Sequence, residues 1–184
     1  LNVMFPMVSE PWEFDAAKQV FEAQLEYLAA RKKQFSSRIR YGAMLEVPAL
    51  AEMLDILLPK IDFLSIGTND LTQFLFAADR ADPRLAERYD WLSLAILRFI
   101  RRVVIACDAH KVDLTVCGEM GGRTLEAMAL IGIGIKRLSI TPAAVGAIKA
   151  MVRSLDAAAI DAEMATILSS PLGSIRQRLE SWAQ

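Results

Sequence analysis

Asp62-Phe-Leu-Ser-Ile-Gly-Thr-Asn-Asp-Leu-Thr-Gln-Phe-Leu-Phe-Ala-Ala-Asp-Arg80 is the stretch that decides the fold of this chain. Residues 61–66 form a short apolar run rich in branched and aromatic side chains, which is typical of a strand buried on both faces. Gly67 ends this run, and Thr68 is predicted to cap a helical turn that begins at Leu71. A buried strand that passes directly into a helix indicates an α/β fold with a parallel sheet.

Strand-like and helix-like segments alternate along the rest of the chain. Strand-like runs occur at residues 3–8, 41–45, 61–66, 113–117 and 137–140. Helical patterns lie between them, at residues 12–30, 49–58, 92–109, 124–131 and 143–153. Residues 156–184 carry no strand signal and predict one or two closing helices, broken near Pro171 and Gly173. This alternation predicts repeated βα units around a parallel sheet.

Five predicted strands are fewer than the eight that close a (β/α)₈ barrel, which needs about 250 residues. The chain is therefore either an open sheet or the C-terminal part of a barrel. Leu1 stands directly before the apolar run at 3–8, without an initiator methionine. This beginning indicates a cut, so residues 1–184 are expected to be part of a longer protein, and the motifs described below decide between the two folds.

Composition excludes several classes of protein. The chain has 184 residues, of which 54% are hydrophobic, and its formal net charge is -1, so no basic field favours nucleic acid. No apolar run approaches the roughly 18 residues that a membrane span needs. Cys107 and Cys117 lack the CxxC spacing of a zinc or redox site. Thiols of this kind predict a reduced, cytoplasmic protein.

Two carboxylates are predicted at the C-terminal ends of neighbouring strands. The strand at 41–45 runs into Glu46, and Pro48 then opens a helix, while Asp70 follows the strand at 61–66. Neighbouring strands lie about 5 Å apart, so these carboxylates would repel each other unless a cation lay between them. Mg²⁺ prefers one or two carboxylates completed by water and substrate oxygens. Glu46 and Asp70 are therefore the predicted Mg²⁺ ligands.

Three further groups are predicted at the same edge of the sheet. Asn69 supplies a hydrogen-bonding amide, and Arg80 supplies a fixed positive charge suited to a carboxylate or a phosphate. Cys117 ends another strand and is followed by glycines that let the backbone bend closely around a ligand. This position makes Cys117 a candidate acid or nucleophile, whereas Cys107 lies within a helical pattern and is predicted to be a core residue.

Four motifs, taken in order, resemble the phosphoenolpyruvate (PEP)-binding barrel of the PEP-utilising enzymes. They are MFPM at 4–7, GAMLEVPA at 42–49, SIGTNDLTQF at 65–74 with ADR at 78–80, and VCGEMGG at 116–122. The resemblance covers essentially the whole chain. Within this family, AADRAD at 77–82 is similar to Enzyme I of the bacterial sugar phosphotransferase system. Tyr89-Asp90 and Leu138-Ser139-Ile140 look closest to the nitrogen-related form of Enzyme I.

The resemblance implies a (β/α)₈ barrel of which this chain supplies about five strands, the fourth to the eighth. It also implies a role for each candidate residue. Glu46 and Asp70 match the magnesium ligands, Asn69 matches the phosphate-binding position, and Arg80 matches a PEP-binding arginine. Cys117 matches the acid that protonates the enolpyruvate carbon.

The implied function is that of a PEP–protein phosphotransferase, a cytoplasmic enzyme. Such an enzyme binds PEP with Mg²⁺, passes the phosphoryl group to a histidine on another domain and releases pyruvate. The family's phosphorylated histidine and its other PEP-binding arginines have no counterpart in these residues, so this chain alone is expected to be inactive. The implied partners are a phosphocarrier protein of the HPr type, bound through that other domain, and a second copy in a homodimer.

Three other functions stay open. A pyruvate phosphate dikinase or PEP synthase would keep the chemistry and change the acceptor, but Met120 and Asp79-Arg80 argue against it. A magnesium-dependent aldolase or lyase acting on pyruvate enolate would not need the Cys117 acid. A non-enzymatic dimerisation module would use the same part of the barrel without its chemistry.

Overall fold

The computed structural model describes residues 1–86, 89–169 and 173–183. Within these residues, parallel strands form a single sheet in the order β1-β2-β3-β4. Strands that follow one another in the sequence are therefore also neighbours in the sheet. The strands are β1 (Asn2–Phe5), β2 (Arg40–Leu45), β3 (Phe63–Gly67) and β4 (Asp113–Cys117). The α/β class and the parallel sheet predicted from the sequence are confirmed, and the C-terminal ends of the strands meet at one edge.

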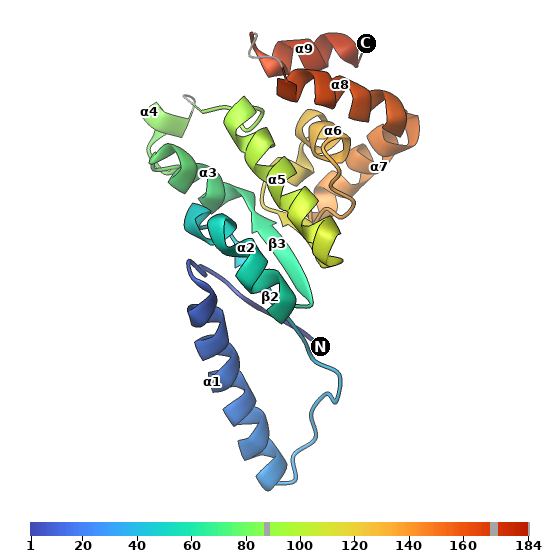
Figure 1. Cartoon of the computed structure of the whole chain (residues 1–184). Helices are drawn as coiled ribbons and strands as arrows, with labels where there is room; N and C mark the ends of the chain where they lie inside the picture. The colour runs from blue at the N-terminus through green and yellow to red at the C-terminus, as the bar shows by residue number, and fades with distance from the viewer. Residues whose placement is uncertain (87–88, 170–172, 184) are drawn as a thin grey trace.

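Helices connect the strands and build the C-terminal part of the molecule. Those between strands are α1 (Pro11–Ala30), η1 (Pro48–Met53), α2 (Leu54–Leu57), η2 (Leu58–Lys60), α3 (Thr68–Phe76), α4 (Pro83–Ala86) and α5 (Leu94–His110). Those after β4 are η3 (Met120–Gly122), α6 (Thr124–Gly132), η4 (Pro142–Ala144), α7 (Val145–Ser154), α8 (Ala157–Ser169) and α9 (Ile175–Trp182). Figure 1 shows α1 at one end of the molecule and α8 and α9 at the other.

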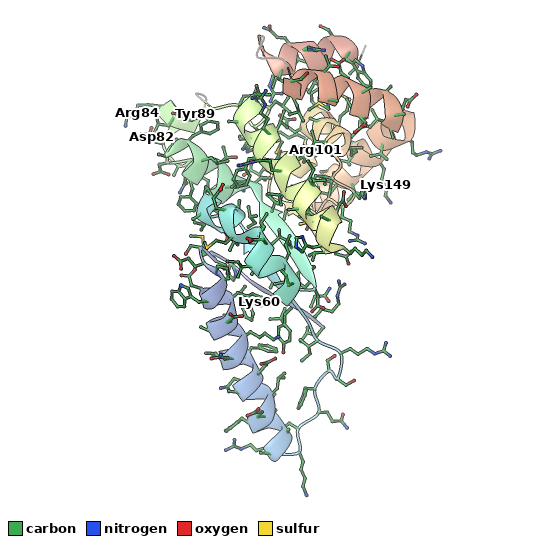
Figure 2. The ribbon with its side chains drawn as sticks, in the orientation of Figure 1. Lys60, Asp82, Arg84, Tyr89, Arg101 and Lys149 are labelled. Carbon is green, nitrogen blue, oxygen red and sulfur yellow. The ribbon has the colours of Figure 1, made fainter. Side chains whose placement is uncertain are left out.

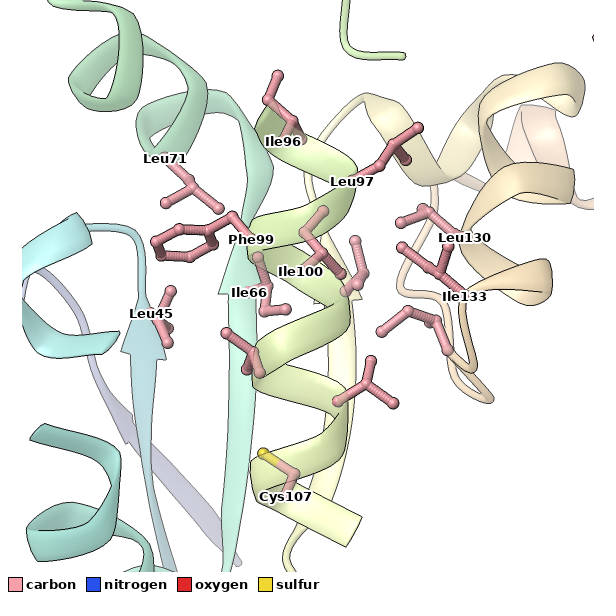
Figure 3. Packing of buried hydrophobic residues seen from close by; sticks show 14 of the residues in the cluster. Leu45, Ile66, Leu71, Ile96, Leu97, Phe99, Ile100, Cys107, Leu130 and Ile133 are labelled. Carbon is pink, nitrogen blue, oxygen red and sulfur yellow. The ribbon is translucent and has the colours of Figure 1, made fainter. Parts of the chain in front are cut away.

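The core forms on both sides of α5. Buried side chains recur along this helix at spacings of three and four residues, which gives it a continuous apolar stripe. In Figure 3, Phe99 and Ile100 lie close to Ile66 of β3, while Leu130 and Ile133 face α5 from the side of α6. Ile66 and Ile100 are both fully buried. The buried central strand predicted at residues 61–66 is therefore confirmed, and α5 joins it to the C-terminal helices.

Two predicted strands are shorter than expected, each for a local reason. β1 ends at Phe5 because Pro6 has no backbone N–H and Met7 adopts a positive φ of 55°. The strand predicted at 137–140 is reduced to one bridge between Leu138 and Val116. Gly118, with a φ of 100°, turns the chain out of the extended conformation just after β4 and so ends the ladder.

Several helix boundaries also differ from the prediction. The helix expected at 49–58 is split into η1, α2 and η2, in part because Pro59 cannot donate a backbone hydrogen bond. The closing segment forms two helices, α8 and α9; the predicted break at Pro171 lies outside the described residues. In the described part of the chain, no helix is both long and apolar enough to cross a membrane.

Candidate active site

Most of the predicted site residues lie at or just after the C-terminal ends of the strands. The register pairs Leu45 with Ile66 and Gly67 with Cys117, so Glu46, which follows Leu45, leaves the sheet beside the end of β3. Asn69 and Asp70 occupy the first turn of α3, which begins directly after β3. The prediction that three strand ends bring these groups to one edge is consistent with this register.

Glu46 is a buried carboxylate, with only 4% of the residue exposed. Its Oε1 accepts a hydrogen bond of 2.7 Å from the Met7 backbone N–H. Its Oε2 lies over Gly67, where an added Cβ would be only 2.7 Å away. The glycine at the end of β3 therefore makes the room that this carboxylate occupies.

Glu46 differs from Glu126, the other buried carboxylate of the described residues, in having no cationic partner. Glu126 is 2% exposed and forms an ion pair of 2.6 Å with Arg176. No Lys, Arg or His of the described residues forms an ion pair with Glu46. A buried carboxylate without a partner is costly, so this position fits a group that binds a cation.

Asp70 supplies the second predicted metal ligand. Its side chain is 33% exposed and lies 3.6 Å from the Arg80 guanidinium. Across the described residues, no three His, Cys, Asp or Glu side chains converge on one point. A metal held by Glu46 and Asp70 would therefore rest on two carboxylates and take its other ligands from water or substrate, and this donor set suits Mg²⁺.

The first turn of α3 fastens the loop that follows β4. The Thr68 hydroxyl donates a hydrogen bond of 2.9 Å to the Cys117 carbonyl, and the Glu119 backbone N–H donates one of 3.1 Å to Asn69 Oδ1. Gly67 is the N-cap of α3, so the predicted capping role of Thr68 is wrong. The hydroxyl instead makes a long-range contact, because α3 starts three residues earlier than expected.

The Cys117 thiol is held by β3. The Ser65 hydroxyl donates to Cys117 Sγ at 3.4 Å, and Sγ lies 3.5 Å from the Ile66 carbonyl. Ser65 is a site residue that the sequence reasoning missed, although it is a polar side chain within an apolar strand. Cys107 is 1% exposed, and burial together with the nearby Asp108 carboxylate raises its pKa to about 12. Cys107 is therefore a core thiol, as predicted.

Gly118→Ala tests whether the loop after β4 can accommodate a side chain at this position. The φ of 100° disfavours a side chain, and an added Cβ would clash with Thr68 Oγ1 and lie 3.0 Å from Asn69 Oδ1. We expect a loss of roughly 1–3 kcal/mol in the free energy of unfolding, measured by denaturant titration. The matched control is Gly146→Ala in α7, where an added Cβ meets no atom within 4 Å. This control should gain about 0.5–1 kcal/mol in the free energy of unfolding. Equal stability of the two variants would show that the loop after β4 does not require glycine at position 118.

Arg80 lies on the segment that follows α3. Ala77 ends the helix with a left-handed conformation, and the Arg80 backbone N–H donates a hydrogen bond of 3.2 Å to Gln73 Oε1. The Arg80 side chain is 53% exposed, so the guanidinium can reach a ligand. Gln73 was not singled out from the sequence, because its contact depends on the turn that Ala77 makes.

A cavity of about 860 Å³ lies beside this edge of the sheet. Two of the predicted residues, Asn69 and Arg80, contribute to its wall, whereas Glu46, Asp70 and Cys117 do not. The lining residues are Asn69, Thr72, Gln73, Ala78, Asp79, Arg80, Ala81, Leu85, Tyr89, Asp90, Trp91, Glu119, Arg123 and Arg176. The cavity therefore shares its edge with the predicted site and extends from there toward the C-terminal helices.

The aromatic wall of the cavity was not predicted. The Arg123 guanidinium lies over the Trp91 ring, 4.6 Å from its centroid. Tyr89 stacks on Phe76 with ring centroids 4.4 Å apart, and Figure 2 shows Tyr89 beside Asp82 near the end of α4. Arginines and aromatic rings together suit an anionic, planar ligand.

Comparisons with known proteins agree with the motifs. A family model described as "PEP-utilising enzyme, PEP-binding domain" matches residues 1–157. The chain is 34% identical over 186 residues to the "Phosphoenolpyruvate-dependent phosphotransferase system" protein of Escherichia coli, covering 97% of this chain and 25% of that protein. It is 36% identical over 156 residues to the "Phosphoenolpyruvate-protein phosphotransferase" of Enterococcus faecalis, covering 85% and 27%. The chain thus spans about a quarter of the length of these relatives.

A solved structure supports the fold independently. The chain aligns with a citrate lyase from Burkholderia xenovorans with a TM-score of 0.57 and 19% identity, covering 98% of this chain and 61% of the other. At this identity the likeness concerns the fold alone. The parallel sheet with its connecting helices is a partial (β/α)₈ barrel, as the motifs implied. The chain belongs to the family of PEP-utilising enzymes, within which it matches the PEP-binding domain.

Proposed function

We propose that this chain binds PEP together with Mg²⁺ and serves a PEP–protein phosphotransferase, which passes the phosphoryl group to a histidine and releases pyruvate. The observation that carries the proposal is the buried carboxylate of Glu46, which has no cationic partner at the sheet edge shared with Asn69, Asp70 and Cys117. The phosphotransferase activity for which the relatives from Escherichia coli and Enterococcus faecalis are named favours this function over others of the family.

PEP carries up to three negative charges, so binding and transferring its phosphoryl group mainly require positioning and neutralisation of charge. Glu46 and Asp70 would hold the metal, and Mg²⁺ when bound would neutralise phosphate and carboxylate oxygens. Arg80 would leave its pairing with Asp70 and contribute a fixed charge to the ligand. Asn69 would donate its amide N–H groups to the phosphate, while its Oδ1 keeps the loop after β4 in place.

Cys117 would complete the reaction by protonating carbon. When the bond between phosphorus and the enol oxygen breaks, the electron pair stays with the enolate of pyruvate. The thiol gives its proton to the methylene carbon of that enolate, which forms pyruvate, and the thiolate recovers a proton from solvent. Contacts with Ser65 and the Ile66 carbonyl keep Sγ in one position for this transfer.

The alternative functions differ either in the molecule that accepts the phosphoryl group or in the bond that is broken. A dikinase or synthase acceptor is disfavoured by the residue types at Met120 and at Asp79-Arg80. A lyase reaction gains no support from the citrate lyase likeness, which concerns the fold alone. A phosphocarrier protein of the HPr type as acceptor and a homodimer as the working assembly remain parts of this proposal.

Radiolabelled PEP tests the reaction class. Incubating the natural full-length protein with phosphoryl-labelled PEP and Mg²⁺ should place the label on a histidine and release an equal amount of pyruvate. The label should be stable in base and labile in acid, as expected for a phosphorus–nitrogen bond. Carbon–carbon bond cleavage or formation without any protein labelling would instead favour the lyase.

A further inference from the structure

Arg176 reaches the cavity from α9, which lies beyond the residues 1–157 that match the family model. Its Nε and Nη2 donate hydrogen bonds of 2.8 and 2.7 Å to the two carboxylate oxygens of Asp90. Nη2 also donates a hydrogen bond of 2.6 Å to Glu126 Oε1. One guanidinium therefore joins the last helix both to the segment before α5 and to α6.

Asp90 is a structural anchor for the entry into α5. The Leu92 backbone N–H donates a hydrogen bond of 3.0 Å to Asp90 Oδ1, and the Ser93 N–H donates one of 2.9 Å to the Asp90 carbonyl. Ser93 then caps α5 through its hydroxyl, which accepts from the Ile96 N–H. The position of Asp90 therefore determines where Trp91 lies in the cavity wall.

The charges of Arg176, Asp90 and Glu126, which together form one cluster, favour a fixed geometry. Burial alone would raise the pKa of Asp90, but hydrogen bonds from Arg176 and the Leu92 N–H lower it below its ordinary value. Hydrogen bonds to Asp90 and then to Glu126 raise the pKa of Arg176. Glu126 is 2% exposed and depends on this guanidinium for its neutralisation. The Asp90 carboxylate and the Arg176 guanidinium therefore stay ionised as a pair at neutral pH.

The same cluster bears on Arg80, because Arg80 lies on the segment between α3 and α5, whose described contacts include those at Arg80 itself, the stacking of Tyr89 on Phe76 and the pair at Asp90. Gln73 accepts from the Arg80 backbone N–H near the start of this segment, and Arg176 holds Asp90 near its end. Arg80, Asp90 and Arg176 line one cavity. Releasing the contact between Arg176 and Asp90 would let the part of the wall that carries Asp90 and Trp91 move relative to α6.

We infer that Arg176 is a positioning residue for PEP binding, acting through Asp90 and Glu126 to hold the cavity wall beside Arg80. This inference rests on the proposed function for its kinetic readout. Arg176 itself is assigned no contact with the substrate. Its loss should therefore weaken substrate binding more than it slows the chemical steps.

The test compares two arginines of the same helix in the natural full-length protein. Arg176→Ala removes the anchor, whereas Arg178→Ala removes an ion pair of 2.6 Å with Glu163 of α8, outside the cavity lining. We expect Arg176→Ala to raise KM for PEP about tenfold or more while kcat stays within about threefold. Arg178→Ala should leave both constants near those of the parent protein.

Two further variants separate positioning from folding. Asp90→Asn keeps the pair between Arg176 and Glu126 and removes only the charged anchor, so it should raise KM with little loss of thermal stability. Arg176→Lys can keep one contact but lacks the planar fork that spans both carboxylate oxygens of Asp90, so it should rescue KM only in part. An unchanged KM in both Arg176→Ala and Asp90→Asn would overturn the inference.

Hydrogen exchange supplies a readout that does not need activity. Amides of residues 90–93 and 119–123 should exchange faster in Arg176→Ala than in Arg178→Ala. If the parent protein turns over no PEP, the proposed function fails, while this exchange still decides whether Arg176 is the anchor. Equal exchange in the two variants would show that Arg176 does not hold the wall.

Discussion

Glu46→Gln should reduce Mg²⁺-dependent PEP binding at least about 100-fold, the largest effect expected of any single change to the binding groups. The substitution keeps the shape of the side chain and its hydrogen bond with the Met7 N–H, but removes the charge that a cation needs. Because Glu46 forms no ion pair with the described residues, neutralising it should leave the melting temperature unchanged or raised. Calorimetric titration of PEP with and without Mg²⁺ measures the binding, and thermal unfolding measures the stability.

Glu163→Gln is the matched control for Glu46→Gln. Glu163 pairs with Arg178 in the C-terminal helices and does not line the cavity. Its neutralisation should leave PEP binding unchanged. Parent-like affinity of Glu46→Gln for PEP in the presence of Mg²⁺ would remove Glu46 from the site and leave its burial unexplained.

Cys117→Ala should reduce pyruvate formation by about 10²–10⁴-fold, which corresponds to roughly 3–5 kcal/mol of barrier, because a positioned acid is lost. PEP binding should persist, since the carboxylates, Asn69 and Arg80 remain. Phosphoryl transfer should be affected less directly than protonation of the enolate. Pyruvate release measured beside PEP affinity separates these effects.

The other cysteine is the control for this experiment. Cys107 is buried in α5, its pKa of about 12 keeps it protonated, and Cys107→Ala should lower stability through a small cavity without slowing the reaction. Normal pyruvate formation by Cys117→Ala would remove Cys117 from the mechanism. It would also reopen the lyase reading, which has no need of this thiol.

Local sequence patterns were sufficient to predict the sheet and its edge. A strand buried on both faces appears in sequence as a continuous apolar run, and Gly67 marks its end, so the positions of Glu46, Asp70 and Cys117 followed from parallel pairing. The strand expected at 137–140 failed because pairing also depends on the partner strand. Gly118 ends that partner by a backbone conformation that the apolar pattern does not reveal.

Contacts between distant segments could not be predicted in this way. Thr68 has the residue type of a helix cap, but its hydroxyl lies against the Cys117 carbonyl only because β3 and β4 pair. Glu46 and Glu126 look alike in sequence, and only the structure separates the carboxylate without a cationic partner from the one that Arg176 neutralises. Arg176 itself lies 50 residues from Glu126, beyond the reach of any local pattern.

Anomalous diffraction from Mn²⁺, substituted for Mg²⁺ in crystals of the natural protein grown with PEP, would locate the metal and its ligands. We expect a metal peak bounded by the carboxylates of Glu46 and Asp70, with the phosphate of PEP completing the coordination and Cys117 Sγ facing the methylene carbon. PEP bound at this edge of the sheet without metal, or a metal peak away from Glu46, would contradict the proposed site.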